Sequence, residues 1–208
     1  PQQSYVSSTP SFTGGGISIV VLLVMVAYAF GAVGFVPHTV FWVDYLAREQ
    51  ELGIQSASAQ WLVFGVGAIC GPLIAGFAAQ RFGWNIALLL AFAAKAGAVM
   101  LPLISVELFS RTLSSFVVGA MVPGIVALTS GCIAELVGAT EHKRYWGLAT
   151  AVFAVAQAST GYAMSALYDV QESYFYLFYI GSAALAGGFA LILLTELIKA
   201  RKLQTYPR

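Results

Sequence analysis

The run ISIVVLLVMVAYAFGAVGFVPHTVFWVDYL, residues 17–46, holds a single Asp, Glu, Lys or Arg side chain, that of Asp44 near its end. A helix that crosses a bilayer needs about 20 mainly apolar residues to span a hydrocarbon layer of about 30 Å. The run therefore predicts a transmembrane helix, and a tilt, a kink or an extension past the surface accommodates its surplus length.

Further apolar runs of the same kind follow, at about residues 57–80, 85–105, 112–137, 145–168 and 174–198. In lipid every backbone polar group needs an internal partner, which favours helices for runs of this length. The sequence thus predicts an all-α membrane protein with six transmembrane helices. We assign residues 1–16 to a linker or tail, 17–202 to the six-helix bundle and 203–208 to a cytoplasmic tail.

The composition excludes several classes of protein. Hydrophobic residues make up 59% of the chain and charged residues 9%, with a mean hydropathy of +0.82, whereas soluble domains carry roughly 25% charged residues. A net charge of +1 is too small for nucleic-acid binding. The two Cys lie inside apolar runs and the two His lack the spacing of a zinc site, so we expect no metal, no cofactor and no enzymatic activity.

Basic residues gather on one side of the predicted membrane. The side that holds both termini carries Arg81, Lys143, Arg144, Lys199, Arg201, Lys202 and Arg208, and the other side carries Arg48 and Arg111. Loops rich in Lys and Arg stay on the cytoplasmic side, so we expect both termini in the cytoplasm. Because the chain begins at Pro1, we also expect a processed product or a piece of a longer chain.

Two of the runs share the pattern Val-Pro-x-x-Val, at residues 36–40 and 122–126, with a Gly shortly before each. Proline removes one helical hydrogen bond, so we expect helix breaks at Pro37 and Pro123. Matching breaks in two halves are typical of transporters with internal repeats, and the bundle then consists of two three-helix repeats. The alternative is that Gly and Pro are simply common in membrane helices.

Several polar side chains lie within the runs. Tyr28, His38 and Trp42 fall on one helical stripe, which predicts either a substrate-binding wall or an interfacial aromatic belt. Gln157 and Thr160 share one face of the fifth run and either bind a ligand or join helices. Near the end of the first run, Asp44 and Arg48 are four residues apart, which predicts a surface ion pair.

Lys95 is the one charged residue in the middle of a run. Ionisable groups at this depth are costly, and they mark a pathway or a buried partner by default. No acidic residue lies at the same depth in the other runs. Lys95 therefore binds an anionic substrate, pairs with an acid outside this chain, or extends its side chain toward one surface.

The stretch after the second run, Gly76-Phe77-Ala78-Ala79-Gln80-Arg81-Phe82-Gly83-Trp84-Asn85, resembles the cytoplasmic loop motif of the major facilitator superfamily. The matching positions are Gly76, Ala79, Arg81 and Gly83. Gln80 stands where the family has an acid, and Trp84-Asn85 stand where it has basic residues. The altered motif resembles the copy between helices 8 and 9, so the chain is similar to the C-terminal half, helices 7–12, of a largely uncharacterised bacterial branch.

This resemblance implies secondary active transport in a bacterial inner (plasma) membrane. In the family, two six-helix halves alternate access to a central site, driven by a proton or solute gradient. The resemblance implies a small-molecule substrate, and the cationic residues favour an organic anion. The complementary six-helix half comes from the same precursor or from another chain. The alternative is a membrane subunit or scaffold that transports nothing and binds partner membrane proteins.

Overall fold

A computed structural model describes residues 18–205, with side chains described for residues 18–201. The expected linker at residues 1–16 and the last residues of the expected tail, 206–208, lie outside the described residues. Backbone at 203–205 is helical, so the last helix extends into the part of the chain assigned to the tail.

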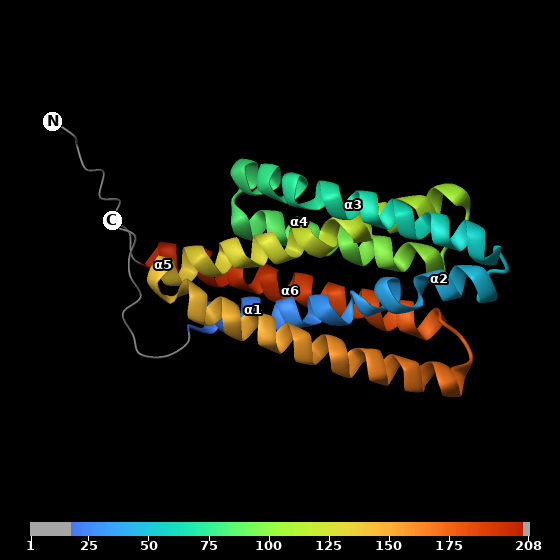
Figure 1. Ribbon diagram of the computed structural model, residues 1–208. Coiled ribbons are helices and arrows are strands. Elements are labelled where there is room, and N and C mark those ends of the chain that lie inside the picture. Colours follow the sequence, from blue (N-terminus) through green and yellow to red (C-terminus); the bar gives the residue numbers. More distant parts are fainter. Residues whose placement is uncertain (1–17, 206–208) are drawn as a thin grey trace.

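The described residues fold into long helices and short helical segments (Figure 1). The long helices are α1 (Ile19–Val33), α3 (Gly53–Phe82), α4 (Trp84–Met100), α5 (Leu108–Gln171) and α6 (Phe175–Thr205). The short segments are α2 (Trp42–Asp44), the π-helices η1 (Pro37–Phe41) and η2 (Tyr45–Glu49), and the 3₁₀-helix η3 (Leu101–Leu103). Five helical stretches within residues 18–205 are long and apolar enough to cross a membrane.

The longest helix, α5, contains the fourth and fifth predicted runs. Gly138 interrupts it with a φ of 76° and a ψ of 169°, a conformation almost restricted to glycine. Figure 1 shows the chain reversing direction there, so we name residues 108–137 the first arm and 139–171 the second arm. The expected loop before Tyr145 is wrong, because the helix resumes directly after Gly138 and the reversal needs no further residues.

The two predicted proline breaks differ. α1 ends at Val33, and Pro37 is the first residue of η1, where the α-helix has given way to a π-helix. Pro123 instead lies inside α5, whose only non-helical backbone is at Gly138, so the predicted break there is wrong. The loss of one hydrogen bond leaves the remaining bonds of the helix in place, and the Pro123 ring packs against Gly71 of α3 as the Pro37 ring packs against Gly181 of α6.

Glycines bring α3 and the first arm into backbone contact. A Cβ atom at Gly67 or Gly71 would overlap the carbonyl oxygens of Phe116 and Ala120, and one at Gly119 would overlap that of Phe64. Small residues four apart permit this close approach in membrane helices. By contrast, Gly65 on the same helix has open space around it.

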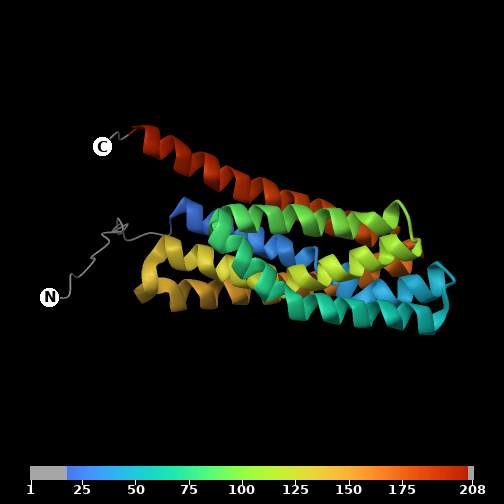
Figure 2. The ribbon, with the colours of Figure 1, turned by 90° about the horizontal axis from the view of Figure 1, so that it is seen from above.

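α1 and α4 lie across from each other, and each packs against both α5 and α6. Phe92 of α4 fills the space between them, because its ring contacts the positions of Gly31 on α1 and Gly188 on α6. Toward its C-terminus, α6 leans away from the other helices (Figure 2). The bundle therefore has a central core between α1, α4, α5 and α6, with α3 attached on the side of the first arm.

The two ends of the bundle differ in charge. The terminal end holds the start of α1, the end of α6 and the reversals at Gly83 and Gly138 (Figure 1). The far end holds the connections at 50–52, 104–107 and 172–174. Basic residues of the described chain concentrate at the terminal end. The sequence predicted this distribution, because it assigned most Lys and Arg residues to the side of the membrane that holds both termini.

Candidate functional site

His38, in η1, is held by a hydrogen-bond relay inside the bundle. Its Nε2 lies 2.8 Å from Ser114 Oγ of the first arm, and Ser114 Oγ donates to the Ala98 carbonyl at 2.7 Å. Because Ser114 uses its only proton on Ala98, His38 Nε2 must carry the proton that it shares with Ser114. The other ring nitrogen, Nδ1, is buried and has no hydrogen-bond partner within the described residues.

A second relay starts one turn further along. Trp42 Nε1 donates to Ser115 Oγ at 2.9 Å, and Ser115 Oγ donates to Gln60 Oε1 of α3 at 3.2 Å. Gln60 Nε2 then donates to Thr112 Oγ1 at 3.4 Å. Adjacent serines of the first arm thus connect the irregular part of the first span to α4 and to α3, and satisfied polar relays of this kind join helices firmly.

The stripe of Tyr28, His38 and Trp42 does not line an open cavity. All three side chains are buried, and His38 stacks on Trp42 with ring centroids 4.6 Å apart. In this conformation the first arm supplies Ser114 and Ser115 as hydrogen-bond partners, and the Phe178 ring of α6 lies 5.3 Å from the His38 ring. These residues build the core, and the sequence pattern could not distinguish a core from a cavity.

Lys95, in α4, is also directed into the core. It is 2% exposed, and its Nζ lies 5.5 Å from the centroid of the Phe35 ring of α1. Across residues 18–201 the structure shows neither a hydrogen bond nor an ion pair for this ammonium group. The side chain therefore does not extend to a membrane surface, and neither Gln157 nor Thr129 bonds to it.

The second arm packs on α1 through aromatic rings. Phe153 lies 4.5 Å from Tyr28 and 6.4 Å from Phe35, and Trp146 lies 5.7 Å from Tyr28, measured between centroids. Gln157 and Thr160 follow on the same arm and are partly exposed. Neither side chain makes a hydrogen bond to any residue whose side chain the structure describes, so two polar groups stay available beside this aromatic row.

At the far end, the end of the first span is tied to the turn before α6. The predicted pair is confirmed, with Arg48 Nε 2.8 Å from Asp44 Oδ1. The Tyr174 hydroxyl donates to Asp44 Oδ2, and the Tyr174 backbone N–H donates to Glu49 Oε2 at 2.7 Å. Burial first, and then the hydrogen bond to the Asp44 carboxylate, raise the pKa of Tyr174 above the usual tyrosine value. No pattern in the sequence signals this contact, because its partners are 130 residues apart.

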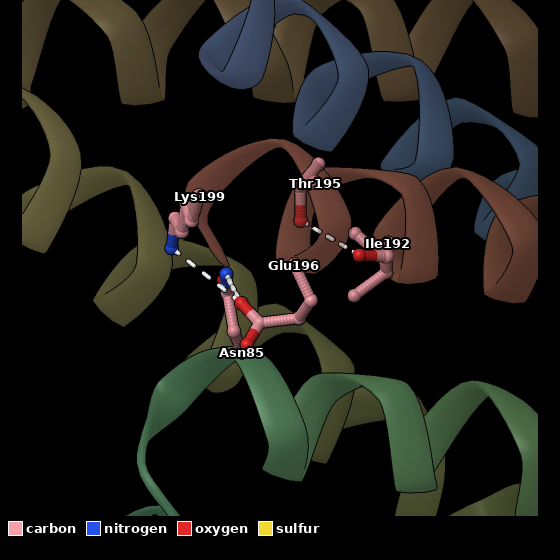
Figure 3. A network of polar contacts seen from close by, with 5 residues as sticks. All are labelled: Asn85, Ile192, Thr195, Glu196 and Lys199. Atoms are coloured by element: carbon pink, nitrogen blue, oxygen red, sulfur yellow. Dashed lines mark hydrogen bonds and ion pairs between the residues drawn. The ribbon is translucent and has the colours of Figure 1, made fainter. Parts of the chain in front are cut away.

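At the terminal end, α4 and α6 are joined by a polar network (Figure 3). The Asn85 side-chain amide donates to Glu196 Oε1, and Lys199 Nζ lies 3.7 Å from the same oxygen. The residue before Glu196 is Thr195, whose Oγ1 donates to the Ile192 carbonyl at 2.7 Å. No local sequence pattern signals the contact of Asn85 with Glu196, because the two residues are 111 positions apart.

The residues of the loop motif lie beside this network. Gly83 makes the reversal between α3 and α4 with a φ of 82°, Arg81 is exposed, and Gly76 has no atom within reach of an added Cβ. The backbone conformation thus explains Gly83 alone. Among the described residues, no group of three or more His, Cys, Asp or Glu side chains could hold a metal ion.

Residues 3–194 match the family described as "Uncharacterised MFS-type transporter YbfB". No curated protein and no solved structure matches the chain.

Proposed function

Because the chain belongs to the major facilitator superfamily of transporters, we propose that it forms a six-span half of a secondary transporter for a small organic solute. The two arms of α5 then count as separate spans, and the bundle consists of two three-helix repeats. A complementary six-helix half, from the same precursor or another chain, completes the transporter. Alternating access moves the solute between the two membrane faces, driven by a proton or solute gradient.

The observation that carries this proposal is the unpartnered amide of Gln157. A polar side chain in the middle of a membrane helix is expensive against lipid, and it normally meets another helix or water. Since Gln157 and Thr160 bond to nothing in the described chain, the side of the second arm that carries them is suited to a water-filled cavity. A solute in that cavity would find two hydrogen-bonding groups beside the aromatic row of Tyr28, Phe35 and Phe153.

The buried candidate residues support this surface from the core of the bundle. Tyr28 supports Phe153, while His38 and Trp42 keep the irregular part of the first span attached to the first arm. Lys95 supplies a positive charge to the core, which favours a solute that carries a negative charge. In this proposal Gln157 and Thr160 touch the solute, and Tyr28, His38, Trp42 and Lys95 position the helices around it.

The charge distribution supports the orientation. Within the described chain the terminal end carries Arg81, Lys143, Arg144, Lys199 and Arg201, and the far end carries Arg48 and Arg111. By the positive-inside rule we propose that the terminal end, with both termini, faces the cytoplasm of a bacterial inner membrane.

A reconstitution experiment tests the function. The chain and its complementary half are placed in proteoliposomes, and uptake of a panel of organic anions and neutral solutes is measured under an imposed pH gradient. We expect uptake of one solute class, with Gln157→Leu, Lys95→Ala and His38→Ala each reducing it and Gln55→Leu, an exposed glutamine of α3, leaving it unchanged. A stable complex of the two halves that takes up no solute would favour the scaffold function instead.

A further inference from the structure

A pocket of about 300 Å³ opens at the far end of the bundle. Its walls come from three segments: Tyr45, Glu49 and Gln50 at the end of the first span, the connection 102–106 between α4 and α5, and Phe175 at the start of α6. Figure 1 shows these segments together at the end away from the termini. Ligand pockets measure about 300–1,000 Å³, so this one suits a small group rather than a large solute.

Hydrogen bonds fix the walls of this pocket. The Tyr45 hydroxyl donates to the Pro102 carbonyl at 3.1 Å, which ties the first span to the connection after α4. Glu49 ties the same span to the start of α6, because its Oε1 accepts from Ser173 Oγ at 3.3 Å and its Oε2 accepts from the Tyr174 backbone N–H at 2.7 Å. Both carboxylate oxygens are therefore held in place before a ligand arrives, and a pre-organised site loses less entropy on binding.

The charged groups around the pocket favour a cation. Glu49 is the one acid among the lining residues, and no Lys, Arg or His of the described chain lines the pocket. Within residues 18–201 the Glu49 carboxylate has no ion pair. The basic residues of this end are engaged elsewhere, since Arg48 pairs with Asp44 at 2.8 Å and Arg111 donates to the Val106 carbonyl at 3.5 Å. The pocket thus offers a negative charge without a counter-ion.

The remaining lining groups specify the kind of cation. The rings of Tyr45 and Phe175 border the pocket, and the faces of aromatic rings attract ammonium groups. Since α4 and η3 end at the connection 102–106, their last carbonyl groups add partial negative charge. The N-terminus of α6 opposite them is already bonded to Glu49. A calcium or magnesium ion needs about six or more ligands, mainly oxygens, which one carboxylate beside two rings does not supply, whereas an ammonium group needs only a few acceptors.

We propose that this far-end pocket binds an organic ammonium group. The Glu49 carboxylate and the carbonyls of the connection accept its hydrogen bonds, and Tyr45 and Phe175 contact its carbon atoms. Two sources carry such a group: a free primary amine, and the ethanolamine headgroup of a phospholipid, whose acyl chains would border Ile104 and Phe175, 73% and 47% exposed. The site is separate from the proposed solute surface beside Gln157, favours the opposite charge and does not depend on transport.

Binding of labelled ethanolamine tests the site. The chain with its complementary half is purified into nanodiscs of phosphatidylglycerol, whose headgroup carries no amine, and saturable binding of ¹⁴C-labelled ethanolamine is measured. We expect one site per chain, which methylammonium displaces and the neutral ethylene glycol does not. Glu49→Gln, which removes the charge and keeps an acceptor, should weaken binding about tenfold or more. The matched control, Glu51→Gln, changes an exposed acid of the same end that does not line the pocket, and it should bind as the wild type does.

A second variant leaves Glu49 in place. Gln50→Lys puts an ammonium group of the chain itself into the pocket, where it pairs with the carboxylate, so binding should be lost while Glu49 still ties the first span to α6. Thermal unfolding shows whether each variant is folded. Ethanolamine should raise the Tm of the wild type and of Glu51→Gln, because a ligand that binds only the folded state stabilises it, and it should leave the Tm of Gln50→Lys unchanged.

Phosphatidylethanolamine in the nanodiscs distinguishes the two sources. If this lipid displaces labelled ethanolamine from the wild type and stays bound to the wild type but not to Glu49→Gln in native mass spectrometry, the headgroup occupies the site; if labelled ethanolamine stays bound, a free amine does. The proposal is overturned if neither compound binds saturably, or if Glu49→Gln and Gln50→Lys bind as the wild type does. Solute uptake is measured separately, so each of these results leaves the transport function to be decided by its own assay.

Discussion

The two arms of α5 pack against their neighbours in opposite ways. The first arm touches the backbone of α3 at Gly67, Gly71 and Gly119, and it holds the first span through the Ser114 and Ser115 relays. The second arm, from Tyr145 onward, rests on α1 through aromatic rings and makes no hydrogen bond to another helix within the described chain. One helix, reversed at Gly138, thus provides both a fixed contact and a loose one.

This difference indicates that the two arms have different roles in the bundle. Backbone contact and satisfied polar relays resist sliding, because any displacement breaks hydrogen bonds in a medium without water. Ring contacts are apolar and tolerate small shifts of one helix against another. The first arm is therefore suited to be the rigid part of the bundle. The outer side of the second arm, where Tyr162 is 83% exposed, is suited to contact a partner or a solute.

The largest effect should come from filling the backbone contact. Gly71→Leu places a side chain against the Ala120 carbonyl and the Pro123 ring, which forces α3 away from the first arm. We expect a loss of about 3 kcal/mol or more in the free energy of unfolding, or failure to accumulate in the membrane. Gly65→Leu on the same helix, where space is open, should change stability by less than about 0.5 kcal/mol. Equal effects of the two variants would show that the α3 contact is not tight.

The next largest effect should come from the polar relay of the first arm. Ser114→Ala leaves His38 Nε2 without its acceptor and the Ala98 carbonyl without its donor. A buried polar group that loses its partner costs about 1–3 kcal/mol, and thermal unfolding in detergent measures this loss. Ser58→Ala, at an exposed serine of α3, is the control and should be neutral. A Ser114→Ala protein as stable as that control would contradict the relay.

A smaller effect is expected at the far end, where the first span meets the turn before α6. Tyr174→Phe removes the hydrogen bond to Asp44 and should cost about 1–2 kcal/mol. The pKa of Tyr174 is raised in the folded state, so its proton contributes stability below the unfolded value of about 10. That contribution declines as the pH rises toward the folded pKa. Denaturation curves at increasing alkaline pH should show the wild type approaching Tyr174→Phe, and a constant difference would contradict the raised pKa.

The smallest effect on stability is expected in the second arm. Gln157→Leu removes a side chain without a hydrogen-bond partner in the described chain, so stability should change by less than about 0.5 kcal/mol. Solute uptake by the complete transporter should nevertheless fall, because the amide is proposed to contact the solute. A marked loss of stability with normal uptake would mean that Gln157 joins helices, and the contrast between the arms would fail.

The sequence predicted those features that depend on neighbours along the chain. Apolar runs located the membrane helices, and the spacing of Asp44 and Arg48 predicted their ion pair. Spacing also put Tyr28, His38 and Trp42 on one face, but it could not show that serines of the first arm would enclose that face. Contacts between distant residues, such as Asn85 with Glu196, have no local signal.

The two prolines likewise show that local sequence does not decide where a helix is interrupted. Proline at 37 and at 123 has the same local chemistry, yet the helix changes type at Pro37 and continues through Pro123. Each ring also packs against a glycine of another helix, Pro37 against Gly181 and Pro123 against Gly71, so this contact does not account for the difference. The polar segment before Tyr145 predicts a loop between two helices. In the structure a single residue with a positive φ, Gly138, makes the reversal instead.

Cysteine accessibility tests the central claim, that the second arm borders a water-filled cavity, most directly. Cys70 and Cys132 are replaced by alanine, and Gln157→Cys is compared with Ile69→Cys, at a 77% exposed position of α3, in the membrane-embedded transporter with both halves. A membrane-impermeant reagent attacks only the hydrated thiolate. We predict that Gln157→Cys reacts and is protected by the transported solute, while Ile69→Cys stays unmodified in lipid. If Gln157→Cys is as inert as Ile69→Cys, the second arm faces lipid or another helix and the proposed solute surface does not exist.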